Sequence, residues 1–438
     1  MAEDIIGFEF DRRYYADLGN HRVLCDNEPL KPPLKKKEFE VLVFFLERPN
    51  QLVARGDVVP LSAINFTRYR LPIDDYVAKL NRRLGWEAGD VFVGTRGVGY
   101  TLKVDVRPVR GIDRQSASEI FKIAEINFNS HTVQHMRSSL QQSVEALERN
   151  PHGLPKARIT AAYDYINLSQ AAYAAELPKD VMLEARELAL EALKHPSTEA
   201  AAHGVLGLID LIYDYNWGKA AEEFATALSR DPDEAPTLLS YAHFLVASGK
   251  FNEAITAIEH AARLTPDDRI VHVSVGWIHL LSGDAKAAVR LGERAIELHP
   301  GFAPAHVMLG WAYEAMGEYD KAIEQYQASL KAEYAPAALA SLGQLYAKLG
   351  RGDEAKGILS SLTTLYERGA IKYLPAYCRA LIYAGLKETE KCLHELEQAY
   401  NQRCDWLIHL ALDRRWDPVR DTARFKLLMT RVGIPYRG

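Results

Sequence analysis

The sequence predicts a chain of two parts, a small α+β domain followed by an all-α superhelical solenoid. Two observations carry this prediction. The first hundred residues alternate short strand patterns with helical patterns and end in a hairpin pattern. From about residue 118 onward the patterns are helical, and one segment recurs about every 34 residues, as expected for stacked helix pairs. A chain of 438 residues is also too long for one ordinary core.

Composition excludes several classes of protein. The chain is 48% apolar and 25% charged, and no apolar run approaches the roughly 20 residues of a membrane span. Its start, MAEDIIGFEF, lacks the basic and apolar regions of a signal peptide, so we expect a cytoplasmic protein without membrane contact. The four cysteines form no CxxC pair, which argues against a disulfide framework or a zinc knuckle.

Charge is distributed unevenly along the chain. Residues 1–110 carry 18 Lys and Arg against 16 Asp and Glu, whereas the remainder carries 35 against 42. The first part is therefore mildly basic and the second acidic. This asymmetry permits nucleic-acid binding at the N-terminal part only.

The N-terminal elements follow from local patterns. Residues 8–30 predict short strands broken by turn formers, and Leu34, Phe39, Leu42, Phe45 and Leu46 have helical spacing. We expect a short helix at 55–61, a third helix at 73–84, and strands at 91–93 and 100–104. The glycines of TRGVGYTL (95–102) lie between two strands, whereas a phosphate-binding loop joins a strand to a helix. They therefore predict a tight hairpin turn.

Four consecutive copies define the repeat, at 248–266, 282–300, 316–334 and 349–367. Turn glycines recur in step, and so do alanines where two helices must approach closely; these residues are Gly249, Gly283, Gly317, Gly350, Ala254, Ala288, Ala322 and Ala355. Looser copies occupy 215–232 and 384–400, and segments 118–151 and 156–196 are compatible with degenerate helix pairs.

These residues resemble tetratricopeptide repeats, which stack helix pairs into a superhelix with a concave groove. The segments DNEPLKPPLKKKEFEVLVFFLERPNQLVARGDVV, DDYVAKLNRRLG and TRGVGYTL resemble the winged-helix DNA-binding domain of OmpR/PhoB-type and CadC- and HilA-like one-component regulators. The resemblance implies a winged helix at 1–106, a linker at 107–117, tetratricopeptide-like repeats at 118–404 (clearest at 201–400) and a capping segment at 405–438. A receiver domain and a membrane helix are both expected to be missing.

The winged-helix resemblance implies specific DNA contacts. Its third helix would enter the major groove and its wing the neighbouring minor groove of a double-stranded promoter. The implied contact residues are Tyr76, Lys79, Arg82, Arg83, Arg96 and Tyr100. A single domain of this size would read a half-site, so a homodimer on a repeated site is expected.

The loop between the second and third helices has two interpretations. In the resembled family this loop often touches RNA polymerase, and Phe66, Arg68, Tyr69 and Arg70 would suit such a contact. Equally, Phe66 and Tyr69 would fold back on their own domain.

One helical position of the repeats reads His243, Trp277, Trp311 and Gln344. On the tetratricopeptide pattern this position faces the concave groove, where stacked aromatic side chains would bind a protein segment, an extended peptide or an apolar small ligand. Alternatively, Trp277 and Trp311 pack between adjacent helices.

No catalytic or metal-binding motif stands out. His131 and His135 are four apart on a predicted helix, but no third ligand is evident, so they are interpreted as surface histidines. GxSxG and GxxxxGK[ST] motifs do not occur. We therefore expect no cofactor, no metal and no enzymatic activity.

The last segment, with Trp406, Leu407, Leu410, Trp416 and Phe425, predicts a cap over the final apolar face or, less simply, a dimer contact. The function that these features favour is a one-component transcriptional regulator, in which the repeats bind a partner or effector or mediate oligomerisation. The alternative is a protein-interaction scaffold whose winged helix has lost DNA binding. Leu71, Asp74 and Asp75 favour this alternative.

Overall fold

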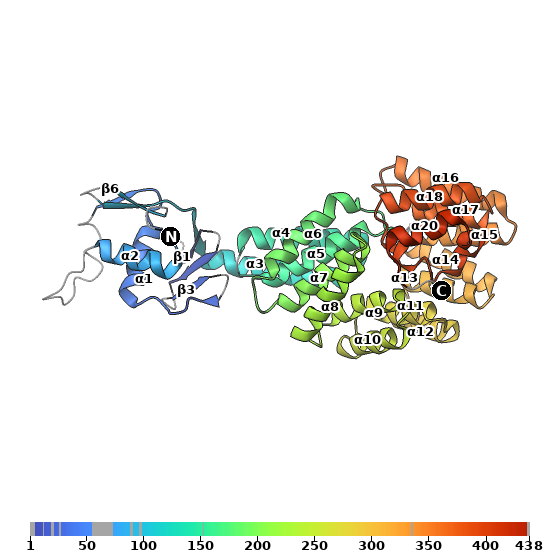
Figure 1. The fold of residues 1–438 in the computed structure, drawn as a ribbon, viewed down its shortest axis with the longest axis horizontal. Coiled ribbons are helices and arrows are strands. Elements are labelled where there is room, and N and C mark those ends of the chain that lie inside the picture. The colour runs from blue at the N-terminus through green and yellow to red at the C-terminus, as the bar shows by residue number, and fades with distance from the viewer. Residues whose placement is uncertain are drawn as a thin grey trace. The chain divides into compact units, whose positions relative to one another are not determined.

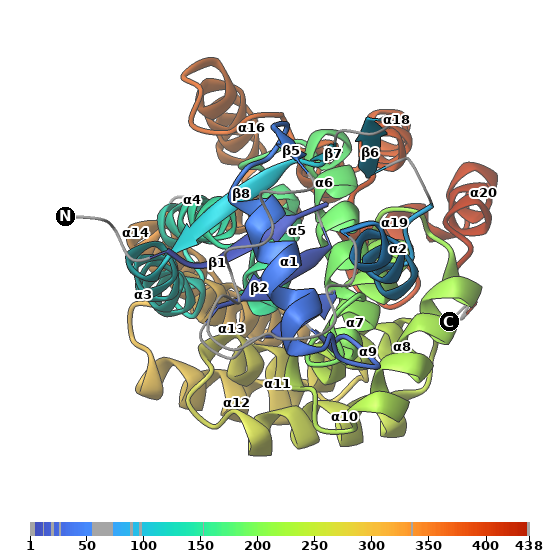
Figure 2. The ribbon, with the colours of Figure 1, turned by 90° about the vertical axis from the view of Figure 1, so that its left-hand side faces the viewer.

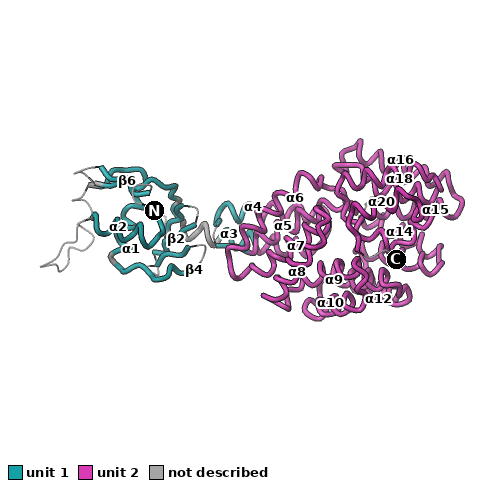
Figure 3. The backbone as a smooth tube through the Cα atoms, viewed as in Figure 1, with its two compact units in different colours: residues 1–121, 145–155 teal, residues 122–144, 156–438 magenta. Residues whose placement is uncertain are grey.

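The computed structural model describes residues 5–11, 13–18, 22–25, 28–54, 73–87, 91–95, 99–151, 153–333 and 336–435. Contacts divide the chain into two units, one of residues 1–121 and 145–155 and the other of residues 122–144 and 156–438 (Figure 3). Helices α3 and α4 contribute residues to both units. No helix within the described ranges has the length and the apolar character to span a bilayer.

Two antiparallel sheets and two helices make up the described part of the N-terminal unit ahead of α3. The first sheet has the strand order β4-β3-β2-β1-β8 and the second has the order β5-β7-β6. The strands are β1 (Ile5–Phe10), β2 (Tyr14–Asp17), β3 (Arg22–Cys25), β4 (Glu28–Pro29), β5 (Leu52–Ala54), β6 (Phe92–Thr95), β7 (Gly99–Leu102) and β8 (Val106–Arg110). The expected hairpin strands at 91–93 and 100–104 are thus present as β6 and β7, with shifted ends.

The two helices begin and end where the sequence provides the signals. Helix α1 (Lys36–Leu46) starts with a capping interaction, in which the Glu38 carboxylate accepts a hydrogen bond of 2.9 Å from the backbone N–H of Lys35. Its apolar side chains Phe39, Leu42 and Phe45 are buried. Helix α2 (Ile73–Leu84) has the predicted bounds and buries Val77, Leu80 and Leu84 on one face. The helix expected at 55–61 lies outside the described residues.

The linker expected at 107–117 is wrong. Residues 106–110 form β8, which pairs antiparallel with β1 at the edge of the first sheet (Figure 2). Residue 111 then begins α3 (Gly111–Phe128). Pro108 and the arginines suggested a polar connection, but an edge strand tolerates a proline because one side of it makes no ladder hydrogen bonds.

The second unit is a stack of helix pairs (Figure 1). Its elements after α3 are α4 (Val133–Arg149), α5 (Pro155–Ser169), α6 (Pro178–Ala192), α7 (Glu199–Ile212), α8 (Trp217–Arg230), α9 (Ala235–Ala247), α10 (Phe251–Leu264), α11 (Arg269–Leu281), α12 (Ala285–Leu298), α13 (Ala303–Ala315), α14 (Tyr319–Ala332), α15 (Pro336–Lys348), α16 (Gly352–Glu367), α17 (Ala376–Gly385) and α18 (Thr389–Asn401). Two short 3-10 turns, η2 (Asp405–His409) and η3 (Arg414–Trp416), lead to α19 (Asp417–Arg420) and α20 (Ala423–Val432).

The two helices of a repeat differ in burial. The first helix, such as α13, is buried around nearly its whole circumference, whereas the second, such as α14, buries the single stripe Ala322, Tyr326 and Ser329. Figure 2 shows α8, α10 and α12 along the outer side of α7, α9 and α11. The repeated alanines 254, 288, 322 and 355 are fully buried, as the sequence predicts.

Glycine occupies the turn between the two helices in the four clearest copies. Gly249, Gly283, Gly317 and Gly350 have φ values of 80°, 93°, 78° and 80°. This left-handed backbone conformation is strained for residues with a Cβ atom. The predicted role of these four glycines is therefore confirmed.

The repeat array also curls back on itself within this unit. The loop between α5 and α6 meets residues about 200 positions later: Lys372 N–H donates to the Ala174 carbonyl at 2.8 Å, and the Tyr373 hydroxyl donates to the Ser169 carbonyl at 3.1 Å. A further contact joins Val133 N–H to the Glu333 carboxylate at 3.2 Å. These contacts close the array into a ring of repeats.

A close helix approach gives a first testable prediction. A Cβ atom on Gly310 would overlap the ring of Tyr326, which is fully buried, whereas a Cβ on Gly301 would meet nothing. Gly310→Ala is therefore expected to lower the free energy of unfolding by about 1–3 kcal/mol. Urea titration followed by circular dichroism measures this, with Gly301→Ala as the matched control. Equal stability of the two variants would contradict the expected overlap.

Candidate docking cleft and candidate nucleic-acid interface

Helix α2 presents a basic edge away from its buried face. Arg82 is exposed and Tyr76, Lys79 and Arg83 are half-buried. The Lys79 ammonium lies 5.6 Å from the centre of the Tyr76 ring, and one Arg83 Nη lies 3.4 Å from the Pro32 carbonyl. The structure thus places these four predicted contact residues together on one helix.

Tyr100 has a specific partner on the same helix. Its hydroxyl donates a hydrogen bond of 2.5 Å to the Asp74 carboxylate, which joins β7 to the first turn of α2. Asp74 therefore points toward the hairpin, and Asp75 is the exposed acidic residue of this turn. Arg96, which the resemblance assigns to a wing, and the loop residues Phe66, Arg68, Tyr69 and Arg70 lie outside the described residues.

The predicted groove position of the repeats is covered by the chain's own C-terminal segment. Trp277 of α11 and Trp311 of α13 meet edge to face with ring centroids 4.5 Å apart, and Trp406 of η2 lies 5.6 and 5.1 Å from them. His243 of α9 lies 5.7 Å from His409 of the same turn. An open aromatic groove is therefore wrong for His243, Trp277 and Trp311: these side chains pack between neighbouring helices and against η2.

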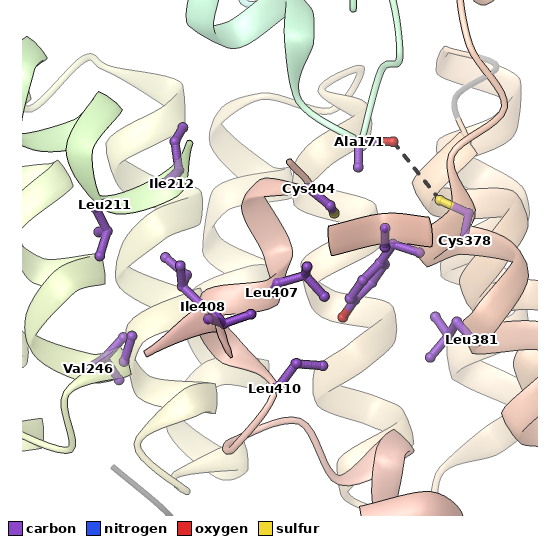
Figure 4. Packing of buried hydrophobic residues seen from close by; sticks show 14 of the residues in the cluster. Ala171, Leu211, Ile212, Val246, Cys378, Leu381, Cys404, Leu407, Ile408 and Leu410 are labelled. Carbon is purple, nitrogen blue, oxygen red and sulfur yellow. Dashed lines mark hydrogen bonds between the residues drawn. The ribbon is translucent and has the colours of Figure 1, made fainter. Parts of the chain in front are cut away.

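An apolar pattern holds the C-terminal segment in this position. Leu407, Ile408 and Leu410 are buried among side chains of α7, α9 and α17 (Figure 4). Two hydrogen bonds fix its start: the Tyr215 hydroxyl donates to the Cys404 carbonyl at 2.9 Å, and Ala171 N–H donates to the Asp405 carboxylate at 3.1 Å. The expected cap thus fills the inner side of the ring in addition to covering the last repeat.

A buried ion pair completes this packing. Arg415 Nη donates to the Asp413 carboxylate at 2.7 Å, and its guanidinium lies 3.1 Å from the centre of the Trp311 ring. Ser341 accepts a hydrogen bond of 2.8 Å from Trp311 Nε1. Burial alone would raise the pKa of Asp413, but the charge and hydrogen bonds of Arg415 outweigh it and lower that pKa below its usual value.

Beside this pair an open cleft of about 1300 Å³ remains. One wall comes from the repeats, including the turns at Gly283 and Gly317 and the end of α17 at Gly385, and the other consists of residues within 411–420. Gln344, the fourth residue of the predicted groove position, lines this cleft together with Trp311. Sequence reasoning identified Gln344 but missed the opposing wall, because nothing local to residues 411–420 indicates what they face.

Known family models match part of the helical region. A tetratricopeptide-repeat family model matches residues 211–273 and 279–342, and a second one matches residues 336–359. The C-terminal region contains tetratricopeptide repeats. No curated protein matches the chain.

Several solved structures are similar to part of the chain. The protein in the crystal structure of MamA is 28% identical in sequence to this chain, and the match covers 36% of this chain and 94% of the MamA chain with a TM-score of 0.30. A tetratricopeptide protein of Thermus thermophilus is 23% identical, with coverage of 43% and 98% and a TM-score of 0.37. The Cut9–Hcn1 complex is 18% identical, with coverage of 68% and 52% and a TM-score of 0.45.

Two neighbouring histidines, His243 of α9 and His409 of η2, make the stability of this unit sensitive to acid. Burial lowers the pKa of His243 to about 4, and burial together with His243 lowers the pKa of His409 to about 3. Below an ordinary histidine pKa of about 6.5 the unfolded chain therefore takes up protons that the folded chain does not. Stability is expected to fall between about pH 6.5 and pH 4.

The variant His409→Gln tests this dependence. Its loss of unfolding free energy between pH 7.5 and pH 5 should be smaller than that of the wild type by about 1–2 kcal/mol. Burial also raises the pKa of Asp405 to about 6, which acts in the opposite direction but equally in both proteins. Urea titrations at the two pH values measure the difference. Parallel pH profiles would show that the buried imidazole does not contribute.

The two histidines predicted to lie on one helix, His131 and His135, each have a different neighbour. His131 has a φ of 49° and precedes α4, and its Nε2 lies 3.7 Å from an Asp268 carboxylate oxygen. His135 lies within α4 and shares a hydrogen bond of 2.7 Å with Thr132. Their expected place on a single helix is wrong, because the residue before the helix adopts a left-handed turn.

Proposed function

We propose that the chain is a protein-interaction scaffold, in which the tetratricopeptide region docks a partner protein. The observation that carries this proposal is the open cleft of about 1300 Å³ along the repeat turns, next to a concave surface already filled by η2. Tetratricopeptide repeats offer extended surfaces for binding protein segments. The proposal assigns the chain a binding role and no catalysis.

Site-specific photo-crosslinking tests the docking role. A photoreactive amino acid is introduced at Met316, which is partly exposed and lines the cleft, and at Leu190, which is exposed on α6 outside it. A discrete crosslinked complex between this chain and a partner protein is expected from position 316 and not from position 190. Its formation should be suppressed by excess unlabelled full-length protein. Identical crosslinking from the two positions, or none from either, would contradict docking at the cleft.

A second function is favoured by a separate observation at the N-terminus. The order of an antiparallel sheet, α1, α2 and the β6–β7 hairpin is that of the resembled winged helix, and Lys79, Arg82 and Arg83 lie on one edge of α2. We therefore propose that this unit binds double-stranded promoter DNA as part of a one-component regulator. In that case the docked partner or a second copy of the chain would govern how the DNA-binding unit is presented to a promoter and to RNA polymerase.

Fluorescence anisotropy of the full chain on mixed-sequence duplex DNA across a salt series tests the second function. Binding should weaken as the salt concentration rises. In a plot of the logarithm of the binding constant against the logarithm of the salt concentration, Lys79→Ala/Arg82→Ala should reduce the slope by about one for each phosphate that the variant no longer neutralises. The control Lys122→Ala/Lys179→Ala removes the same charge from exposed positions on α3 and α6. Arg96→Ala serves as the variant of the wing. If the wild type shows no salt-dependent DNA binding, the second function is contradicted and the scaffold remains the proposed function.

A further inference from the structure

The charges around the cleft do not balance. The wall carries three carboxylates, and each has an ion-pair partner within the wall: Glu314 with Lys348 at 3.4 Å, Asp413 with Arg415 at 2.7 Å, and Asp417 with Arg420 at 3.0 Å. Lys387 and Arg414 also line the cleft, and neither forms an ion pair with any residue that the structure describes. Two uncompensated positive charges therefore face the cleft from its opposite walls.

A buried amide supplies a second and independent feature. Gln344 is only 4% exposed, and its Oε1 has no hydrogen-bond partner in the described part of the chain. Leaving a buried amide oxygen without a donor is costly, so the position is best satisfied by a group that enters the cleft. A glutamine amide carries both an acceptor and donors, and it can exchange two hydrogen bonds with one peptide unit.

The size and position of the cleft favour an extended chain over a small molecule. Its volume of about 1300 Å³ exceeds the ~300–1000 Å³ of typical small-ligand pockets. It runs past the turns at Gly283 and Gly317 and the end of α17 at Gly385, and Leu280, Met316 and Trp311 add apolar atoms to its lining. Such a wall suits a segment with alternating acidic and apolar side chains.

We propose that this cleft docks an extended acidic segment of a partner protein. Carboxylates of the segment pair with Lys387 and Arg414, and a peptide unit between them bonds to the Gln344 amide. The inference rests on the docking function proposed above and adds to it the chemistry of the partner. It also moves the docking site from the aromatic stripe, which η2 fills, to the edge of the repeats.

Peptide selection on the full-length protein tests this proposal. Random ten-residue peptides displayed on phage are selected on the wild type at low salt, and enriched sequences are measured by fluorescence anisotropy. Enriched peptides should carry several Asp or Glu residues. Lys387→Glu/Arg414→Glu should weaken their binding by about tenfold or more, because two attractive pairs become repulsive. The control Lys179→Glu/Lys356→Glu makes the same change of charge at exposed positions outside the cleft and should bind nearly as the wild type does.

Two further measurements locate the site. Gln344→Ala should weaken binding by roughly threefold to tenfold, with a melting curve to confirm that it folds. Hydrogen–deuterium exchange should show protection by the peptide at 282–285, 316–319 and 411–420. Peptides without acidic bias, equal weakening by both charge-reversal variants, or protection elsewhere would each overturn the inference and leave the docking function standing. A selection that enriches nothing would overturn the inference as well, while the crosslinking experiment judges the docking function separately.

Discussion

Replacing Trp416 with alanine is expected to lower the free energy of unfolding by about 3–5 kcal/mol. Trp416 is fully buried at the end of η3, and its ring meets Tyr377 of α17 edge to face with centroids 5.2 Å apart. Removing the indole leaves a cavity that the fixed helices around it cannot close. It also loosens the segment that covers Trp277 and Trp311.

Urea denaturation followed by tryptophan fluorescence and by circular dichroism measures this effect. Leu427→Ala is the matched control, because Leu427 is 59% exposed on α20 and its truncation should change stability by less than about 0.5 kcal/mol. A loss of less than about 1 kcal/mol for Trp416→Ala would show that the C-terminal segment is not part of the folded core.

The second large effect is expected from Arg415→Met, which leaves the Asp413 carboxylate buried without its partner. Breaking such a pair from one side costs about 3–5 kcal/mol. The double variant Asp413→Asn/Arg415→Met removes both charges and should recover a large part of the loss. Urea titrations of the wild type, both single variants and the double variant give the coupling between the two residues.

The pH dependence of the same variants provides a separate check. In the wild type the lowered pKa of Asp413 contributes stability that is present above about pH 4 and is lost as the pH falls through the folded-state pKa. Without Arg415, burial raises the pKa of Asp413, so this carboxylate takes up a proton more readily in the variant. The difference in unfolding free energy between the wild type and Arg415→Met should therefore shrink toward acidic pH. Arg424→Met, which breaks exposed pairs with Glu390 and Glu397, is the control and should cost at most about 1 kcal/mol. A difference in unfolding free energy between the wild type and Arg415→Met that is constant from pH 7 to pH 4.5 would contradict the role given to the buried carboxylate.

The repeats were predictable from sequence because their determinants recur at short range. In the four clearest copies a glycine stands at the turn and a buried alanine at the closest approach, and both recur in step. The bounds of α2 were also predicted correctly, since Val77, Leu80 and Leu84 mark one face of a single helix.

The features that sequence reasoning missed depend on contacts over long distances along the chain. Trp406 covers a tryptophan 129 positions earlier, and nothing near Trp277 indicates this. The edge strand β8 was interpreted as a linker because its pairing partner, β1, lies about a hundred residues before it. The cleft was missed for the same reason: its two walls are assembled from separate repeats and from the C-terminal segment.

The closure of the repeat array into a ring has a consequence for how this unit unfolds. In an open solenoid each repeat contacts only its neighbours, so the ends fray and unfolding spreads in steps. Here the hydrogen bonds that Tyr373 and Lys372 donate to the carbonyls of Ser169 and Ala174 join early and late repeats. Trp406 of η2 also contacts both Trp277 of α11 and Tyr377 of α17. An end can therefore not fray without breaking contacts at the other end. The unit should unfold in one cooperative transition on heating. Under a pulling force applied across it, it should unfold in one event at high force and not in a series of small events.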